Sequence, residues 1–114
     1  MEEHYIKILL KDHGKDPEIK KIRKQLKQMQ EVVGGYIEAI PYKGAVLVCN
    51  EEGKLNNLEP NVDLGFDHIL GSFFMVGDDE KNGDFKSLTD DEIKKFKKEF
   101  SLNLENKKED EMEM

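Results

Sequence analysis

The sequence has a single cysteine and no long run of apolar side chains. One cysteine, Cys49, excludes an internal disulfide, and its place in the apolar run 45–49 indicates a small buried thiol rather than a reactive group. No apolar run approaches the roughly 18 residues of a membrane-spanning helix. The acidic start of the chain, Met1 to His4, lacks the basic and apolar regions of a signal peptide. We therefore expect a cytoplasmic protein with no membrane partner.

The chain also lacks an overall excess of positive charge, because its formal net charge is −7. An acidic field opposes the phosphate neutralisation on which general nucleic-acid binding depends, so we do not expect a nucleic-acid partner. The charge is unevenly distributed. Residues 15–27 carry six basic and two acidic side chains, whereas residues 105–114 carry five acids and two lysines.

Motifs for catalysis and for metal binding are missing. The three histidines show no HxxxH spacing, and Ser72 lacks the GxSxG pattern of a hydrolase nucleophile. The acidic run 78–84 fails as a calcium loop, because a start at Asp78 places Thr89 where the loop needs a bidentate glutamate. A solvated turn explains this run better. We expect no enzyme, no metal and no cofactor.

Hydrophobic periodicity predicts the first half of the fold. Residues 5–10 are apolar and β-branched and predict a strand. Asp16 and Pro17 are typical of a helix start, and apolar side chains follow at spacings of three or four up to Val33, with the lysines of this stretch facing water. Gly34 and Gly35 then end the helix and reverse the chain, because glycine adopts positive φ without a steric clash.

The second half predicts more strands and one further helix. Strands are expected at 36–40, 45–49 and 69–76, with a tight turn at 50–53 in which Gly53 takes positive φ, an irregular excursion over 55–67 and a polar turn over 77–84. Thr89 and Glu92 form a capping box, with Leu88 and Ile93 as its hydrophobic staple. The predicted fold is a two-layer α+β domain, with two helices on one face of a mostly antiparallel four-stranded sheet in the order β-α-β-β-loop-β-α.

Domain boundaries and assembly follow from the same patterns. One domain is expected over residues 1–104, since a chain of this length forms a single core. The acidic segment 105–114 offers little to bury and is expected to be disordered unless a partner orders it. Strand 45–49 is apolar on both faces, as expected of an interior strand that is covered on both sides or that contacts a partner chain. With both helices on one face, the other face of the sheet is left for a partner chain. We therefore expect a homo-oligomer.

The turn between the first strand and the first helix is the best candidate for an anion site. Lys11, His13 and Lys15 lie there, before the free N–H groups of the expected helix. An ordinary exposed turn remains the alternative, because an Asp16 cap competes for the same donors. Tyr36, Asn50, Asn61 and His68 are further polar candidates near the ends of the expected strands. The basic side of the expected first helix is a second candidate surface, for a nucleic acid or an acidic partner, and a face that is simply solvated is the favoured alternative.

The order of these segments resembles a known family. The corner at residues 34–38 (GGYIE), the turn at 49–55 (CNEEGKL), Pro60 with Asn61, and the strand ending at Gly77 are similar to small phage and mobile-element proteins catalogued as domain of unknown function 3846. The resemblance covers residues 5–100. It implies a compact protein in the cytoplasm of a bacterial host, and it supplies no activity and no catalytic residues.

Two functions from different classes follow from this setting. The first is a non-enzymatic protein that binds and sequesters a small phosphate-bearing, nucleotide-derived ligand, such as a host immune signal, as an anti-defence protein. The alternative is a protein-binding inhibitor or adaptor that acts on a host protein through the basic helix face, an uncovered sheet face or the acidic tail. An enzyme ranks third, because the sequence brings no titratable groups together.

Overall fold

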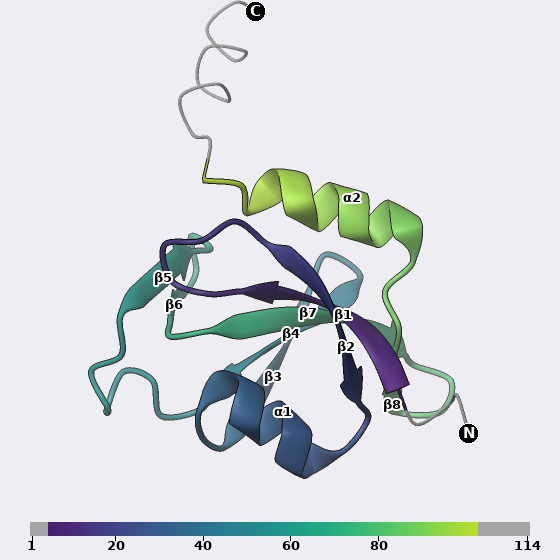
Figure 1. Ribbon diagram of the computed structural model, residues 1–114, viewed down its shortest axis with the longest axis horizontal. Helices are drawn as coiled ribbons and strands as arrows, with labels where there is room; N and C mark the ends of the chain where they lie inside the picture. Colours follow the sequence, from purple (N-terminus) through teal and green to yellow (C-terminus); the bar gives the residue numbers. More distant parts are fainter. Residues whose placement is uncertain (1–4, 103–114) are drawn as a thin grey trace, which may run out of the picture.

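The computed structural model describes residues 5–102, in which an antiparallel sheet is covered by two helices (Figure 1). The strands are β1 (Tyr5–Lys11), β2 (Glu18–Arg23), β3 (Ile37–Tyr42), β4 (Ala45–Asn50), β5 (Pro60–Asp63), β6 (His68–Leu70), β7 (Phe73–Asp79) and β8 (Asp84–Lys86), and the helices are α1 (Leu26–Val33) and α2 (Asp90–Glu99). Six strands form one sheet in the order β2-β1-β7-β4-β3, with β8 also paired to β7, while β5 and β6 form a separate ribbon. The expected α+β class is confirmed, and β2 and β8 extend the four expected strands to six.

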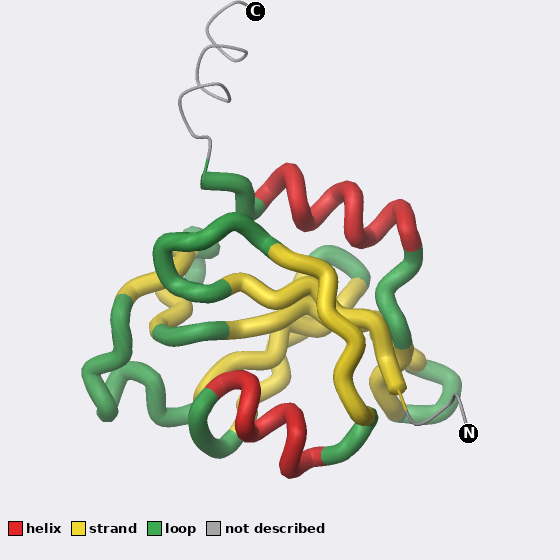
Figure 2. Tube along the Cα trace, in the orientation of Figure 1, coloured by secondary structure: helices red, strands yellow, loops and turns green. Residues whose placement is uncertain are grey.

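The two helices cover opposite faces of the sheet, as the red segments of Figure 2 show. On β1, Ile6 and Ile8 face α1, while Leu9 faces α2. The expectation that both helices share one face is therefore wrong. Strand 45–49 is apolar on both sides because each side is buried within this same chain, which is the first of the two explanations that its sequence allowed. The argument from an uncovered sheet face no longer supports self-association, and the homo-oligomer stays a prediction.

Residues 18–23 form strand β2, where the sequence predicts the start of a helix. Ile19 and Ile22 are three residues apart, a spacing that suits one helix face but places them on opposite faces of a strand. Ile22 pairs with Ile6 and is buried, whereas Ile19 is 47% exposed. Antiparallel pairing with β1 thus outweighs the local helical pattern. Helix α1 begins only at Leu26 and buries Met29 and Val33.

The glycine corner after α1 is confirmed, with a different role for each glycine. Gly34 caps the helix at φ 81° and its N–H donates to the carbonyl of Gln30. Gly35 is required by space, because a Cβ there would lie 2.8 Å from Nδ2 of Asn50. The chain reverses at this corner, so that β3 pairs antiparallel with β4.

The expectations for residues 50–84 need four corrections. Gly53 does not adopt positive φ, and its missing side chain instead leaves room for the carbonyl of Leu70. The excursion 55–67 contains β5, which pairs with β6. The expected strand 69–76 is interrupted at Gly71, where φ is 82°, and the polar turn 77–84 is the hairpin between β7 and β8. The strand pairs β5–β6 and β7–β8 were not predicted because their residues are largely polar, and hairpin strands at a surface need few apolar residues.

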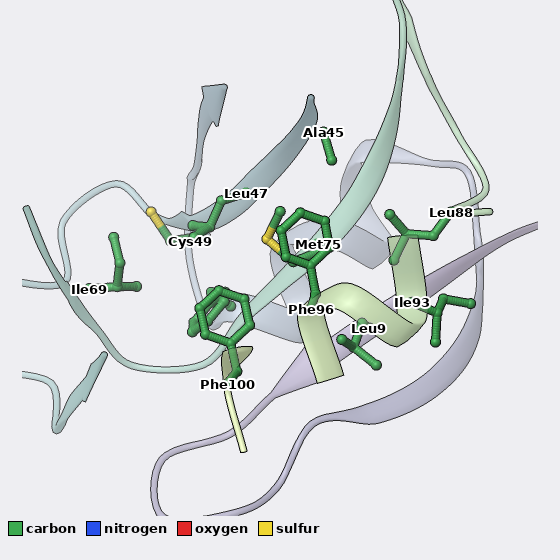
Figure 3. Packing of buried hydrophobic residues seen from close by; sticks show 11 residues of the cluster. Leu9, Ala45, Leu47, Cys49, Ile69, Met75, Leu88, Ile93, Phe96 and Phe100 are labelled. Carbon is green, nitrogen blue, oxygen red and sulfur yellow. The ribbon is translucent and has the colours of Figure 1, made fainter. Parts of the chain in front are cut away.

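Helix α2 begins where the sequence predicts. Thr89 accepts a hydrogen bond from the Glu92 N–H at 3.1 Å, and the Glu92 carboxylate accepts one from the Thr89 N–H at 2.9 Å. The helix turns Ile93, Phe96 and the following Phe100 onto the sheet (Figure 3). Phe96 is fully buried and stacks on Phe100, with ring centroids 6.1 Å apart. The capping box therefore sets the register in which α2 closes one core.

The expected domain limit at residue 104 and the expected disorder of 105–114 lie outside the described residues. The described part contains a core on each face of the sheet, and α2 closes the second of them near the end of that part.

Candidate functional site

Lys11, at the end of β1, is the only lysine buried in the described part of the chain, with 1% of its surface exposed. Strand alternation turns it to the same face as Leu9, under the last turn of α2. Its ammonium group donates to the carbonyl of Asp12 at 3.0 Å and to Oδ1 of Asn61 at 2.9 Å. Within residues 5–102, no carboxylate forms an ion pair with it. A buried positive charge is thus held by neutral oxygens alone.

Asn61 joins three segments of the chain at this point. Its Oδ1 accepts from Lys11 Nζ, and its Nδ2 donates to the Lys11 carbonyl at 2.8 Å and to the Gly71 carbonyl at 2.9 Å. One side chain of β5 therefore ties the end of β1 to the break between β6 and β7. This network fixes the orientation of both polar groups.

A hollow of about 330 Å³ lies beside this pair. It is lined by Lys11, by residues 61–64 and by residues 99–102, and we call it the Lys11 hollow. Val62, Leu64, Phe100 and Leu102 give it apolar walls. Strand β5, within the excursion 55–67, and the end of α2 therefore build one concave surface over a buried cation.

The charge of Lys11 is disfavoured by its surroundings. Burial lowers the pKa of the ammonium group from its ordinary value of 10.5, while Asp16 and Asp12 act in the opposite direction. Asp16 lies in the turn after β1, and its Oδ1 accepts from the N–H of Leu102 at 2.8 Å. Asp12 accepts from the Ser72 hydroxyl at 2.5 Å. Asp16 therefore holds one wall of the hollow through Leu102, and both carboxylates act on Lys11 from a distance.

The carboxylates that line the Lys11 hollow are engaged by other partners. Glu99 accepts from the Tyr42 hydroxyl and from Lys43 Nζ, the latter at 3.0 Å. Asp63 accepts from the Gly65 N–H at 2.8 Å and lies 3.7 Å from His68 Nδ1. Glu99 thus has a cationic partner in Lys43, and Lys11 is the one cation among the described residues that line the hollow.

The other members of the predicted turn lie at the surface. His13 donates from Nδ1 to the Pro60 carbonyl at 2.6 Å, next to Asn61, while its Nε2 is 3.8 Å from Glu59. Lys15 is exposed, and its N–H donates to the Asp12 carbonyl at 3.2 Å. The predicted helix start that would have supplied free N–H donors is absent, because β2 follows this turn. Among the predicted residues of this turn, buried Lys11 is therefore the remaining candidate for an anion site.

Three predicted site residues lie away from the Lys11 hollow. Asn50 is buried and bonds the Val33 carbonyl at 3.2 Å and the Glu52 N–H at 2.8 Å, so its side chain serves the corner after α1. Tyr36 is 65% exposed beside that corner. His68 is exposed and borders a second, smaller hollow of about 160 Å³ near Lys54 and Asp67. Of the seven predicted residues, the structure brings together Lys11, Asn61 and, at the margin, His13.

Sequence reasoning missed the apolar walls of the site. Phe100 is part of the buried stripe of α2, and its second role in the hollow has no separate sequence signal. Leu102 offers a weak signal, as an apolar residue just after the helix that is 47% exposed. Residues 61–64 looked irregular because the ribbon of β5 and β6 is short.

Cys49 is buried on β4, as the sequence predicts, with 4% of its surface exposed. Burial, together with Glu38 and Asp67, raises the pKa of its thiol to about 12. The thiolate is the reactive form, so we expect no reaction of the native protein with Ellman's reagent near pH 8, and one full equivalent after unfolding in guanidinium. A native reaction as fast as that of glutathione would contradict this placement.

Other kinds of site find no support among residues 5–102. No three histidine, cysteine, aspartate or glutamate side chains gather there as a metal site would require. In the described part, no helix has the length and apolar character to cross a membrane. The acidic run 78–84 is a hairpin in which Asp79 bonds Asn82 at 2.9 Å.

Comparison with known proteins gives one result beyond the structure itself. No curated protein and no solved structure matches the chain. The model of one protein family, described as a domain of unknown function (DUF3846), matches residues 6–101. Because this match spans most of the 114 residues, the chain belongs to the DUF3846 family.

Proposed function

We propose that this protein is a small non-enzymatic binding protein whose Lys11 hollow takes the phosphate of a nucleotide-derived ligand. The observation that carries the proposal is the buried ammonium of Lys11, which has neutral oxygen partners and, among residues 5–102, no ion-paired carboxylate. An unpaired buried cation costs several kcal/mol, and an anion in the adjoining hollow offsets that cost. The site is thus more stable when an anion is bound.

The shape of the hollow favours a ligand with an anionic and an apolar part. Its volume of about 330 Å³ lies at the lower end of the range for small-molecule sites, which begins near 300 Å³. Val62 and Phe100 offer apolar surface beside the cation. A mononucleotide combines a phosphate with a flat, largely apolar base. In a phage or mobile-element setting, sequestering such a molecule would remove a host immune signal.

The alternative, a protein-binding inhibitor, loses two of its expected surfaces. Both faces of the sheet are covered by helices, and the basic side of the expected first helix does not exist, because β2 replaces the first half of that helix. Ligand binding in the Lys11 hollow is therefore the better supported proposal.

Replacing Lys11 tests the proposal directly. In a calorimetric titration with inorganic phosphate, ribose 5-phosphate and adenosine monophosphate, we expect Lys11→Met to weaken binding at least about tenfold. A hydrogen bond to a charged group contributes about 1.5–3 kcal/mol, and methionine keeps the length of the side chain without its charge. Lys15→Met, in the same turn but exposed, is the matched control and should bind as the wild type does.

Two results would contradict the proposal. One is equal affinity of the wild type and Lys11→Met for every probe that binds. The other is conversion of the nucleotide during incubation, seen by mass spectrometry, since sequestration returns the ligand unchanged. Affinity should also fall as the pH rises through the lowered pKa of Lys11, before an ordinary lysine near 10.5 loses its proton.

A further inference from the structure

Three basic side chains of β1 and β2 lie on the α2 side of the sheet. The register pairs Lys7 with Lys21 and Tyr5 with Arg23. All four alternate with Ile6 and Ile22, which are buried on the α1 side. The Arg23 guanidinium lies over the Tyr5 ring, 5.3 Å from its centre. Lys7, Lys21 and Arg23 therefore line the sheet beside α2.

Helix α2 adds two lysines to the same surface. Asp90 lies 3.9 Å from Lys7, which identifies the side of α2 that faces β1 and β2. Lys94 and Lys97 are four and seven residues after Asp90 and share this side, while Glu99 faces Tyr42 on the other side. We call the set Lys7, Lys21, Arg23, Lys94 and Lys97 the basic face.

The basic face is electrostatically unfavourable as it stands. Lys7 and Lys21 are directly opposite each other across two strands, an arrangement of like charges that destabilises a sheet. Among residues 5–102, the one ion pair of these five side chains joins Lys7 to Asp90, whose side chain is 97% exposed and, at 3.9 Å, is a weak partner. Five cations thus gather on one surface of a protein whose net charge is −7.

We propose that the basic face binds the acidic segment 105–114 of this same chain. That segment carries five acids and two lysines. It follows Leu102, whose N–H is bonded to Asp16 in the turn that leads into β2. Residues 103–114 reach about 40 Å when extended, whereas α2 is only about 15 Å long, so every cation of the face is within reach. Tethering gives a local concentration in the millimolar range.

The intramolecular contact is screened by salt, because its charges are at the surface. The inference does not depend on the Lys11 hollow, since none of the five basic residues lines it.

The test compares amide spectra of two full-length, isotopically labelled proteins. In one, the acids of the segment are neutralised: Glu105→Gln, Glu109→Gln, Asp110→Asn, Glu111→Gln and Glu113→Gln. We expect the resonances of Lys7, Lys21, Lys94 and Lys97 to move on neutralisation. High salt should move the wild-type resonances in the same direction.

Lys21→Glu and Lys20→Glu form a matched pair of variants. Lys21 is on the basic face, whereas Lys20 pairs with Ile8 on the α1 side. We expect Lys21→Glu to release the acidic segment, so that the resonances of the segment move to the positions seen in the neutralised protein. The same substitution should raise the midpoint temperature of thermal unfolding, since it places opposite charges across the strands. Lys20→Glu should leave the segment bound.

Three outcomes would overturn the proposal. In the first, neutralisation moves only the resonances of residues 103–114. In the second, the shifts depend on protein concentration, which assigns the contact to a second copy. In the third, the face responds to an added single-stranded oligonucleotide but not to neutralisation, which assigns it to an external polyanion.

Discussion

Phe96→Ala is expected to lower the free energy of unfolding by about 3–5 kcal/mol, the range for truncating a buried phenylalanine. Phe96 has no exposed surface and stacks on Phe100, and its ring centroid is 6.2 Å from that of Tyr42. Truncation leaves a cavity under α2 that neighbouring side chains fill only in part. The measurement is urea denaturation followed by circular dichroism.

Phe66→Ala is the control for this experiment. Phe66 is 66% exposed, so the same chemical change should cost less than about 1 kcal/mol. Equal effects of the two substitutions would mean that α2 does not close the core as described. Because Phe100 also lines the Lys11 hollow, Phe96→Ala should weaken anion binding as well, by loosening that wall.

Asn61→Ala is expected to cost about 2–4 kcal/mol, because it removes three hydrogen bonds at once and leaves buried polar groups unpaired. The carbonyls of Lys11 and Gly71 lose their amide donor, and the Lys11 ammonium loses an acceptor. The measurement is again the free energy of unfolding, together with hydrogen exchange in β5 and β6, where protection should fall first.

Two further substitutions separate the roles of Asn61. Asn56→Ala, in an exposed turn, is the control and should change stability by less than about 0.5 kcal/mol. Asn61→Asp gives Lys11 a carboxylate partner but removes both N–H donors. We expect the Asn61→Asp variant to remain less stable than the wild type. We also expect it to lose anion binding, since the new carboxylate pairs with the Lys11 ammonium in place of a ligand. Wild-type stability in Asn61→Ala would show that the network is not formed.

Sequence reasoning succeeded where a local interaction decides the structure. The Thr89 and Glu92 capping box is complete within four residues, and Gly34 ends α1 by a conformation that glycine alone adopts easily. Sequence reasoning failed over residues 18–23. The spacing of Ile19 and Ile22 fits a helix, and only the pairing of Ile22 with Ile6 shows that the segment is a strand. Such pairing over long sequence distances is decided by the rest of the fold.

Two polar residues of the candidate site were predictable from the sequence, but its apolar walls and its geometry were not. Lys11 and Asn61 are both polar residues near the ends of apolar segments, which made them candidates. Their contact joins residues that are fifty positions apart in the sequence, and no local pattern predicts it. The burial of Lys11 is equally hidden, because the covering side chains come from β5 and from the end of α2.

The central position of β7 has a consequence for the order of folding. Each of the pairs β1–β2, β3–β4 and β7–β8 is a hairpin of neighbouring strands, which forms within microseconds. Strand β7 joins the other two hairpins by pairing with β1 and with β4. Closing a loop of more than sixty residues between Leu9 and Met75 costs conformational entropy before any contact between β1 and β7 can offset that cost. During synthesis, β1 and β4 each present an unpaired strand edge until residues 73–79 leave the ribosome, and this interval is when the chain is most open to aggregation.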